Sequence, residues 1–155
     1  MDVELVARLR GVISRLARQL NATATGEGLT PTQYSVLGLI RWRGPLGLAE
    51  LTELEGVNPT MLSRIVRKLD EDGLIQRLPD PNDLRAVRVQ ITPAGDELHG
   101  RIRTRRSGVL ADWIQRLPPE TQETLLAAVP AMEALADVVG PARPTKPANQ
   151  ASTRP

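Results

Sequence analysis

Three segments of the chain begin with a capping residue followed by proline, and a helical pattern follows each of them. These dipeptides are Thr30-Pro31, Asn58-Pro59 and Thr92-Pro93. The first residue can cap the helix with its side chain, and proline suits the first helical turn. Gly44 and Gly73 stand where the first two of these helices should end. Such signals restrict the chain to a series of short helices, because each helix can grow only between its own start and stop.

Apolar residues repeat at spacings of three and four in most of the chain, which predicts amphipathic helices. The predicted helices cover residues 3–20, 31–43, 48–55, 58–72, 93–116 and 120–139. Pro130 lies inside the last pattern, where we expect a kink or a break. The period changes to two at 74–78 and 87–91, which predicts two strands joined by a loop near 79–86. The sequence therefore predicts a mainly α fold with a small β-hairpin.

Composition excludes several kinds of site. The chain has 155 residues, enough for one domain, and it contains no cysteine and a single histidine, His99. Disulfides, thiolate catalysis and His-rich metal sites are therefore excluded, and we expect no metal and no cofactor. No apolar run approaches the roughly 20 residues of a membrane span, and no signal peptide precedes the first helix. We expect a cytoplasmic protein.

Charge alone does not identify a partner. The chain has 20 basic and 18 acidic residues, and all the basic ones are arginine except Lys68 and Lys146. Arginine matches phosphate and guanine edges well, but codon usage in a GC-rich genome is the favoured explanation of the excess. The positions of the arginines must therefore decide whether the chain binds nucleic acid.

The order of the predicted elements indicates a winged helix-turn-helix. The helices 48–55 and 58–72 are joined by Gly56-Val57, and the hairpin follows the second helix directly. In such modules the second helix enters the major groove of DNA and its N-terminal residues contact base edges.

The helix 58–72 has a polar face suited to that task. Its apolar residues face the core, and hydroxyls and guanidiniums occupy the opposite face. Free main-chain amides at its start, including those of Thr60 and Met61, also suit a phosphate. If the helix stood alone, we would interpret this polar face as an ordinary solvated surface. Because a turn precedes the helix and a hairpin follows it, we favour the DNA-binding interpretation instead. The candidate DNA contacts are Asn58, Thr60, Met61, Ser63, Arg64 and Arg67.

The predicted hairpin supplies three further candidates, which are Asp83 and Arg85 at the tip of its loop and Arg88 further along the chain. An arginine on an exposed hairpin beside a groove-bound helix can reach the neighbouring minor groove. Asp83 would repel phosphate if free, so we expect it to pair with an arginine of the same module and keep the loop in shape. A solvated turn without function remains the alternative.

Four ordered stretches, 29–37, 58–75, 80–87 and 91–95, form a recognisable set, and the last two contain a wing pattern made of Asp83, Arg85, Ile91, Thr92 and Gly95. With this set, residues 30–100 resemble the MarR family of bacterial transcriptional regulators. The resemblance implies a homodimer that binds a pseudo-palindromic operator, with Arg85 in the minor groove and Asp83 as its supporting acid. It also implies that a small organic or anionic effector releases the DNA in many members.

The resemblance implies one domain over residues 1–140. Residues 1–22 and 93–140 would be dimerisation helices, 30–92 the DNA-binding lobe, and we expect 141–155 to be a disordered tail. Apolar stripes on the first and last helices favour a dimer independently, because they must be buried against each other or against a second chain.

The sequence leaves the effector and its residues unknown. The chain has three aromatic residues, Trp42, Trp113 and Tyr34. One interpretation is that they line a pocket for a flat ligand, and the one we favour is that they pack in the core. A basic run follows on the helix 93–116, with Arg101, Arg103, Arg105 and Arg106. It would attract the DNA backbone or an anionic effector, but we slightly favour the interpretation that it is a solvated helix face. We expect His99 at the surface or an interface rather than as a ligand.

The interpretation we favour is a sequence-specific, dimeric transcriptional regulator, most simply a repressor. The alternative is a winged-helix protein-interaction module that does not bind DNA. An enzyme ranks last, because His99 has no nucleophile motif near it and no Gly-rich phosphate loop follows a strand.

Overall fold

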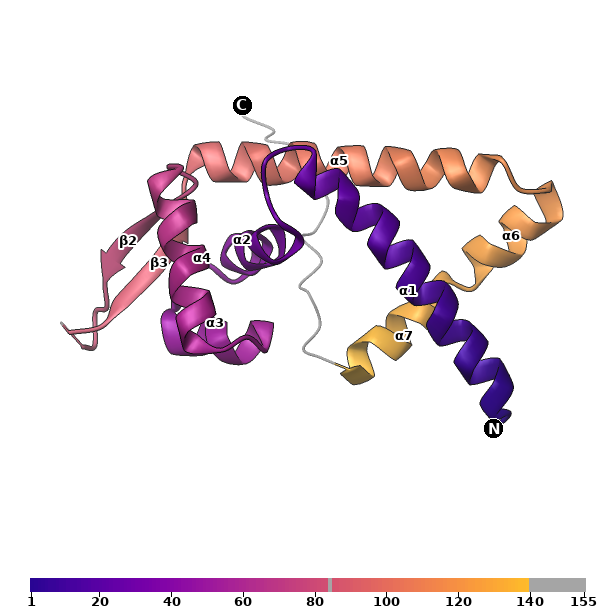
Figure 1. Ribbon diagram of the computed structural model, residues 1–155, viewed down its shortest axis with the longest axis horizontal. Helices are drawn as coiled ribbons and strands as arrows, with labels where there is room; N and C mark the ends of the chain where they lie inside the picture. Colours follow the sequence, from indigo (N-terminus) through magenta and orange to yellow (C-terminus); the bar gives the residue numbers. More distant parts are fainter. Residues whose placement is uncertain (84, 140–155) are drawn as a thin grey trace, which may run out of the picture. The chain divides into compact units, whose positions relative to one another are not determined.

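The computed structural model describes residues 1–83 and 85–139 (Figure 1). The tail 141–155, which the sequence predicts to be disordered, lies outside the described residues. The chain divides into two compact units, Met1–Trp113 and Ile114–Pro155, which are described separately below.

The predicted helices and strands of the first unit are present within a few residues of their expected bounds. The one clear difference in length is at the first helix, which continues to Thr25 instead of fading at Asn21. The helices are α1 (Val3–Thr25), α2 (Pro31–Arg43), α3 (Leu48–Glu55), α4 (Pro59–Glu71) and α5 (Pro93–Gln115), and the strands are β1 (Leu46–Gly47), β2 (Ile75–Pro79) and β3 (Val87–Ile91).

The cap-and-proline starts form as their sequences predict. Before α2, the Gln33 N–H donates to Thr30 Oγ1 at 3.2 Å, and the Thr30 N–H donates to Gln33 Oε1 at 2.8 Å. Before α5, Thr92 Oγ1 accepts from the Gly95 N–H at 3.1 Å. Each bond satisfies an amide that has no partner within its own helix, so the start of the helix is fixed locally.

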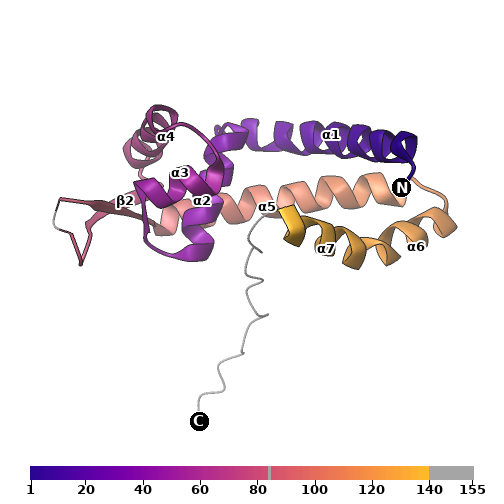
Figure 2. The ribbon, with the colours of Figure 1, turned by 90° about the horizontal axis from the view of Figure 1, so that it is seen from below.

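A third strand, β1, completes the sheet and was not predicted from the sequence. The strand order is β1-β3-β2 and both pairs are antiparallel, with Leu46 opposite Val89 and Ile75 opposite Ile91. Because β1 leads directly into α3, the hairpin is bonded to the start of the helix-turn-helix. The hairpin projects away from α2, α3 and α4 (Figure 2).

The core of the first unit lies between the sheet and α2, α3 and α4. The predicted core face of α4, which consists of Leu62, Ile65, Val66 and Leu69, is buried. Leu37 and Ile40 of α2, Leu51 of α3 and Val89 of β3 are buried with it. The apolar pattern of the sequence therefore identified the inner side of this helix correctly.

The expectation that His99 lies at the surface or an interface is wrong. Its side chain is 4% exposed and stacks on the ring of Tyr34, with the centroids 4.6 Å apart and the planes 3° apart. The Arg106 guanidinium lies 4.8 Å from the same Tyr34 centroid. His99 and Arg106 are seven residues apart on α5, or about 10.5 Å along a helix axis. The Tyr34 ring therefore fits between the two side chains.

The second unit consists of α6 (Pro119–Ala127) and α7 (Val129–Val139). The two helices separate at Ala128, two residues before Pro130, so the predicted break is confirmed. Leu125, Leu126, Met132 and Leu135 form an apolar stripe on this unit that is largely exposed. No described helix has both the length and the apolar character needed to cross a bilayer.

Candidate nucleic-acid interface

The polar face predicted for α4 exists as a continuous surface. Thr60, Ser63, Arg64 and Arg67 are exposed and together line an open hollow of about 440 Å³. The opposite side of α4 is buried, so the packing of the helix fixes the main-chain positions from which these side chains project. Hydroxyl and guanidinium groups in this arrangement can donate to phosphates and to base edges.

The start of α4 differs from the expectation in one respect. Asn58 Oδ1 accepts from the Met61 N–H at 2.8 Å, which is the usual bond of an N-cap residue. The amide of Met61 is therefore engaged, and the expectation that it is free for a phosphate is wrong. The Met61 side chain is 42% exposed beside the polar face.

The basic side chains on and beside α4 differ in whether they form ion pairs with carboxylates of the chain. Lys68 Nζ bonds Asp72 at 2.7 Å, and this bond raises the pKa of Lys68. Arg77 Nε bonds Asp70 at 2.8 Å, whereas Arg67 Nε lies 4.0 Å from Glu71. Within the described part of the chain Arg64 makes no ion pair with any carboxylate. Its guanidinium therefore keeps its donors open toward solvent.

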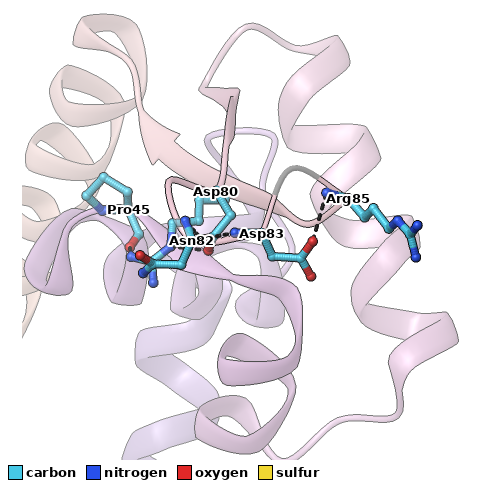
Figure 3. Close-up of polar contacts among 6 residues, drawn as sticks. Pro45, Asp80, Asn82, Asp83 and Arg85 are labelled. Carbon is cyan, nitrogen blue, oxygen red and sulfur yellow. Dashed lines mark hydrogen bonds and ion pairs between the residues drawn. The ribbon is translucent and has the colours of Figure 1, made fainter.

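In the hairpin loop the ion pair predicted for Asp83 is made by a different carboxylate (Figure 3). Asp83 Oδ1 accepts the main-chain N–H of Arg85 at 2.9 Å. The arginine–carboxylate pair joins Arg88 Nε to Asp80 Oδ2 at 2.7 Å. The expectation that Asp83 pairs with an arginine side chain is therefore wrong, although its carboxylate does shape the loop. Sequence reasoning missed Asp80, whose signal is its place near the start of the predicted loop 79–86.

Two arginines of the wing have different surroundings. The Arg85 side chain is exposed and extends away from the other labelled residues (Figure 3). Arg88 donates from Nε to Asp80 and from Nη1 to the Pro45 carbonyl at 3.2 Å. The hydrogen bond from Arg88 is the main reason that the pKa of the Asp80 carboxyl lies below its usual value, and the same bond raises the pKa of Arg88. A DNA contact by Arg88 stays a prediction, since much of its guanidinium is already used within the chain.

The basic run of α5 has partners in the chain. Arg101 bonds Glu97 at 3.0 Å, Arg105 bonds Glu27 at 2.9 Å, and Arg106 bonds Asn21 at 3.2 Å. The Arg103 guanidinium lies 5.6 Å from the ring centroid of Trp42. Arg103, Arg105 and Arg106 therefore contact residues outside α5, whereas Arg101 pairs within it, so the run is more than a solvated face.

The aromatic residues lie in separate surroundings. Tyr34 packs against the core and Trp42 is half-buried beside Arg41 and Arg103. Trp113 lines an open cavity of about 390 Å³ with Arg15, Leu16 and Gln19. No group of three or more potential metal ligands is found in the described ranges 1–83 and 85–139.

Comparison with known proteins gives a consistent result. The sequence profile described as MarR family matches residues 29–87. The multiple antibiotic resistance protein MarR of Salmonella typhimurium is 40% identical over 78 residues, which is 50% of this chain and 54% of that protein. The HTH-type transcriptional repressor MdtR of Bacillus subtilis is 24% identical over 127 residues, 82% of this chain and 79% of that one. The crystal structure of RV1404 from Mycobacterium tuberculosis has a TM-score of 0.77 at 25% identity and covers 88% of this chain and 95% of its own.

Proposed function

Because this chain belongs to the MarR family of transcriptional regulators, we propose that it binds a pseudo-palindromic operator as a homodimer and represses transcription. The observation that carries the proposal is the exposed face of α4, where Thr60, Ser63, Arg64 and Arg67 line one hollow. Arg64 is the group we expect to contact a base, since its donors are open. A guanidinium bonding both O6 and N7 of guanine is the commonest specific contact in the major groove.

Arg85 would supply the second contact, in the minor groove beside the site of α4. The hairpin projects from the lobe and the Arg85 side chain extends from its tip (Figures 2 and 3). A narrow minor groove concentrates negative potential and attracts arginine. Asn58 and Asp83 would contribute by fixing the main chain on either side of the interface, and Arg88 through its bonds to the loop.

A homodimer would use the helices that flank the lobe. On α1, the exposed large apolar residues are Val3, Leu5, Val6, Leu9, Val12, Ile13 and Leu16. A stripe of this size is unusual on a monomer and favours burial against a second copy. Residues 1–22 and 93–140 are thus proposed as the dimerisation region and 30–92 as the DNA-binding lobe. A two-fold axis would place the two α4 helices about 34–36 Å apart, one turn of DNA.

Release of the operator by a small organic or anionic effector completes the proposal. It rests on the family resemblance, and no residue is assigned to that site. We also propose that the protein acts in the cytoplasm and catalyses no reaction.

The proposal is tested by selecting fragments of the host's own DNA and titrating the best one at fixed salt. Arg64→Ala should weaken binding by about 1–3 kcal/mol if the side chain contacts a base. Arg101→Ala removes a positive charge from an ion pair on α5 and is the matched control. Equal affinity of the two variants would remove Arg64 from the interface, and a wild-type protein that selects no DNA would refute the proposed function.

The dimer is tested separately by sedimentation equilibrium. Leu9→Glu and Ile13→Glu place charges in the α1 stripe and should shift the protein toward the monomer. A wild-type protein that sediments as a monomer would contradict the proposed assembly.

A further inference from the structure

The carboxylate of Asp80 organises the first half of the loop between β2 and β3. Its Oδ1 accepts the main-chain N–H groups of Asn82 at 2.8 Å and Asp83 at 3.2 Å (Figure 3). The N–H of Asp80 itself donates to the Ala86 carbonyl at 3.1 Å, which closes the loop. Bonds from main-chain amides to an ionised carboxylate are stronger than bonds between neutral groups. One side chain thus fixes the main chain from residue 80 to residue 83.

Asp83 organises the second half in the same way. Its carboxylate accepts the Arg85 N–H at 2.9 Å, and its carbonyl accepts the Ala86 N–H at 2.9 Å. The two carboxylates act in series, because Asp80 fixes the position of Asp83, and Asp83 fixes the main chain of Arg85. The main-chain position of Arg85, from which its side chain projects, therefore depends on Asp80, although the two side chains do not touch.

Arg88 connects this loop to the helix-turn-helix. Nε donates to Asp80 Oδ2 at 2.7 Å, and Nη1 donates to the Pro45 carbonyl at 3.2 Å. Pro45 immediately precedes β1, and β1 leads into α3. The Asp80 side chain is 14% exposed, so its bonds are partly shielded from water. A single guanidinium thus joins the wing loop to the segment that begins the DNA-binding helices.

We propose that Asp80, Arg88 and the Pro45 carbonyl form a clamp that positions Arg85 for the minor groove. This inference rests on the proposed function, and it makes Asp80 and Arg88 positioning residues rather than DNA contacts. A loop that is ordered before binding spends less of the binding free energy on its own ordering. The bonds made by Asp80 and Arg88 come from the chain itself, so the clamp is present before DNA binds.

The clamp and an effect of charge alone predict opposite changes in the DNA affinity of Asp80→Asn. Asp80→Asn removes a negative charge close to DNA, which by charge alone strengthens binding. Loss of the clamp weakens it, because Arg85 is no longer held in place. The double variant D80N/R88Q leaves the net charge unchanged, so any loss of affinity it shows cannot be attributed to net charge.

The test is a titration of wild-type protein, D80N, D80N/R88Q and a control against the selected DNA at fixed salt. The control, E97Q/R101Q, removes a different exposed ion pair, on α5, and also keeps the net charge. We expect D80N and D80N/R88Q to bind roughly 3- to 10-fold more weakly than wild type, which is the usual range for reordering a side chain or two. The control should bind as wild type does. Equal affinity of D80N/R88Q and E97Q/R101Q would overturn the clamp.

A double-mutant cycle separates positioning from a general loss of structure. If the clamp acts through Arg85, breaking it in an Arg85→Ala background should cost no further affinity. A full additional loss in that background would show that the clamp acts elsewhere and would overturn the proposal.

Amide hydrogen exchange of the free protein tests the same inference without DNA. D80N/R88Q should speed exchange at Asn82, Asp83 and Arg85, while exchange in α4 should stay unchanged. Unchanged exchange in the loop would refute the clamp even if the wild-type protein binds DNA. Failure of the wild-type protein to bind any selected DNA would instead refute the proposed function.

Discussion

Gly95 occupies a position where the close approach of two elements leaves no room for a side chain. It is the third residue of α5, and a Cβ atom placed on it would lie 2.0 Å from the Leu74 carbonyl oxygen and 2.9 Å from Ile91 Cγ1. The same Leu74 oxygen accepts the Thr92 N–H at 3.1 Å. In Gly95→Ala the start of α5 must move by more than an ångström, roughly, to restore an ordinary contact.

The expected cost follows from these contacts. Overpacking here costs about 3 kcal/mol, the upper part of the usual range, because the nearest partner is the main-chain carbonyl of Leu74. Loss of the bond between Thr92 and Leu74 adds about 1 kcal/mol. The helix preference of alanine over glycine offsets about 1 kcal/mol. We therefore expect Gly95→Ala to lower the free energy of unfolding by about 3 kcal/mol and the melting temperature by roughly 6–12 °C.

Gly100→Ala is the matched control for this prediction. Gly100 lies on the same helix, and nothing lies within 4 Å of a Cβ placed there. Its replacement should stabilise the protein by about 0.5–1 kcal/mol. Both variants are measured by urea unfolding at one protein concentration, since association would shift the midpoint. A Gly95→Ala protein as stable as Gly100→Ala would refute the packing argument.

Two further predictions concern the start of α4 and the wing. Asn58→Ala removes the acceptor of the Met61 amide and should lower the free energy of unfolding, measured in urea, by about 1 kcal/mol. Asn58→Asp keeps an acceptor and should be close to wild type. An equal loss of stability in both variants would contradict the capping role. The pKa of Asp80 is lower in the folded protein than the ordinary value of 3.8, so its contribution to stability is full above pH 4, roughly, and is lost as the pH falls through the folded pKa. The amide chemical shifts of Asn82 and Asp83 should therefore stay constant from pH 7 to about pH 4 and move below it. The same movement in Asp80→Asn would show that another group is responsible.

The parts of the fold that the sequence predicted depend on local contacts. The capping box of Thr30 and Gln33 joins residues three apart, so its two halves are visible together in the sequence. The core and polar faces of α4 follow from helical period alone, because one face is fully buried and the other fully exposed.

The parts that the sequence could not predict depend on partners distant along the chain. Strand β1 has only two residues, and it is a strand because Leu46 lies opposite Val89. His99 is buried because Gly38 of α2 leaves space for its ring, with Nε2 3.0 Å from the place of a Cβ. The pairing of Asp80 with Arg88 depends on the register of β2 and β3, which puts Leu78 opposite Arg88. None of these positions carries a pattern of its own.

The ring of Tyr34, between His99 and Arg106, has a mechanical consequence. The space that the ring fills is bounded along α5 by side chains seven residues apart, or about two turns of helix. Sliding of α5 along its axis relative to α2 therefore pushes one of these side chains against the ring. The Tyr34 ring therefore couples the position of α5 along its axis to that of α2, the helix that packs against α4 in the lobe.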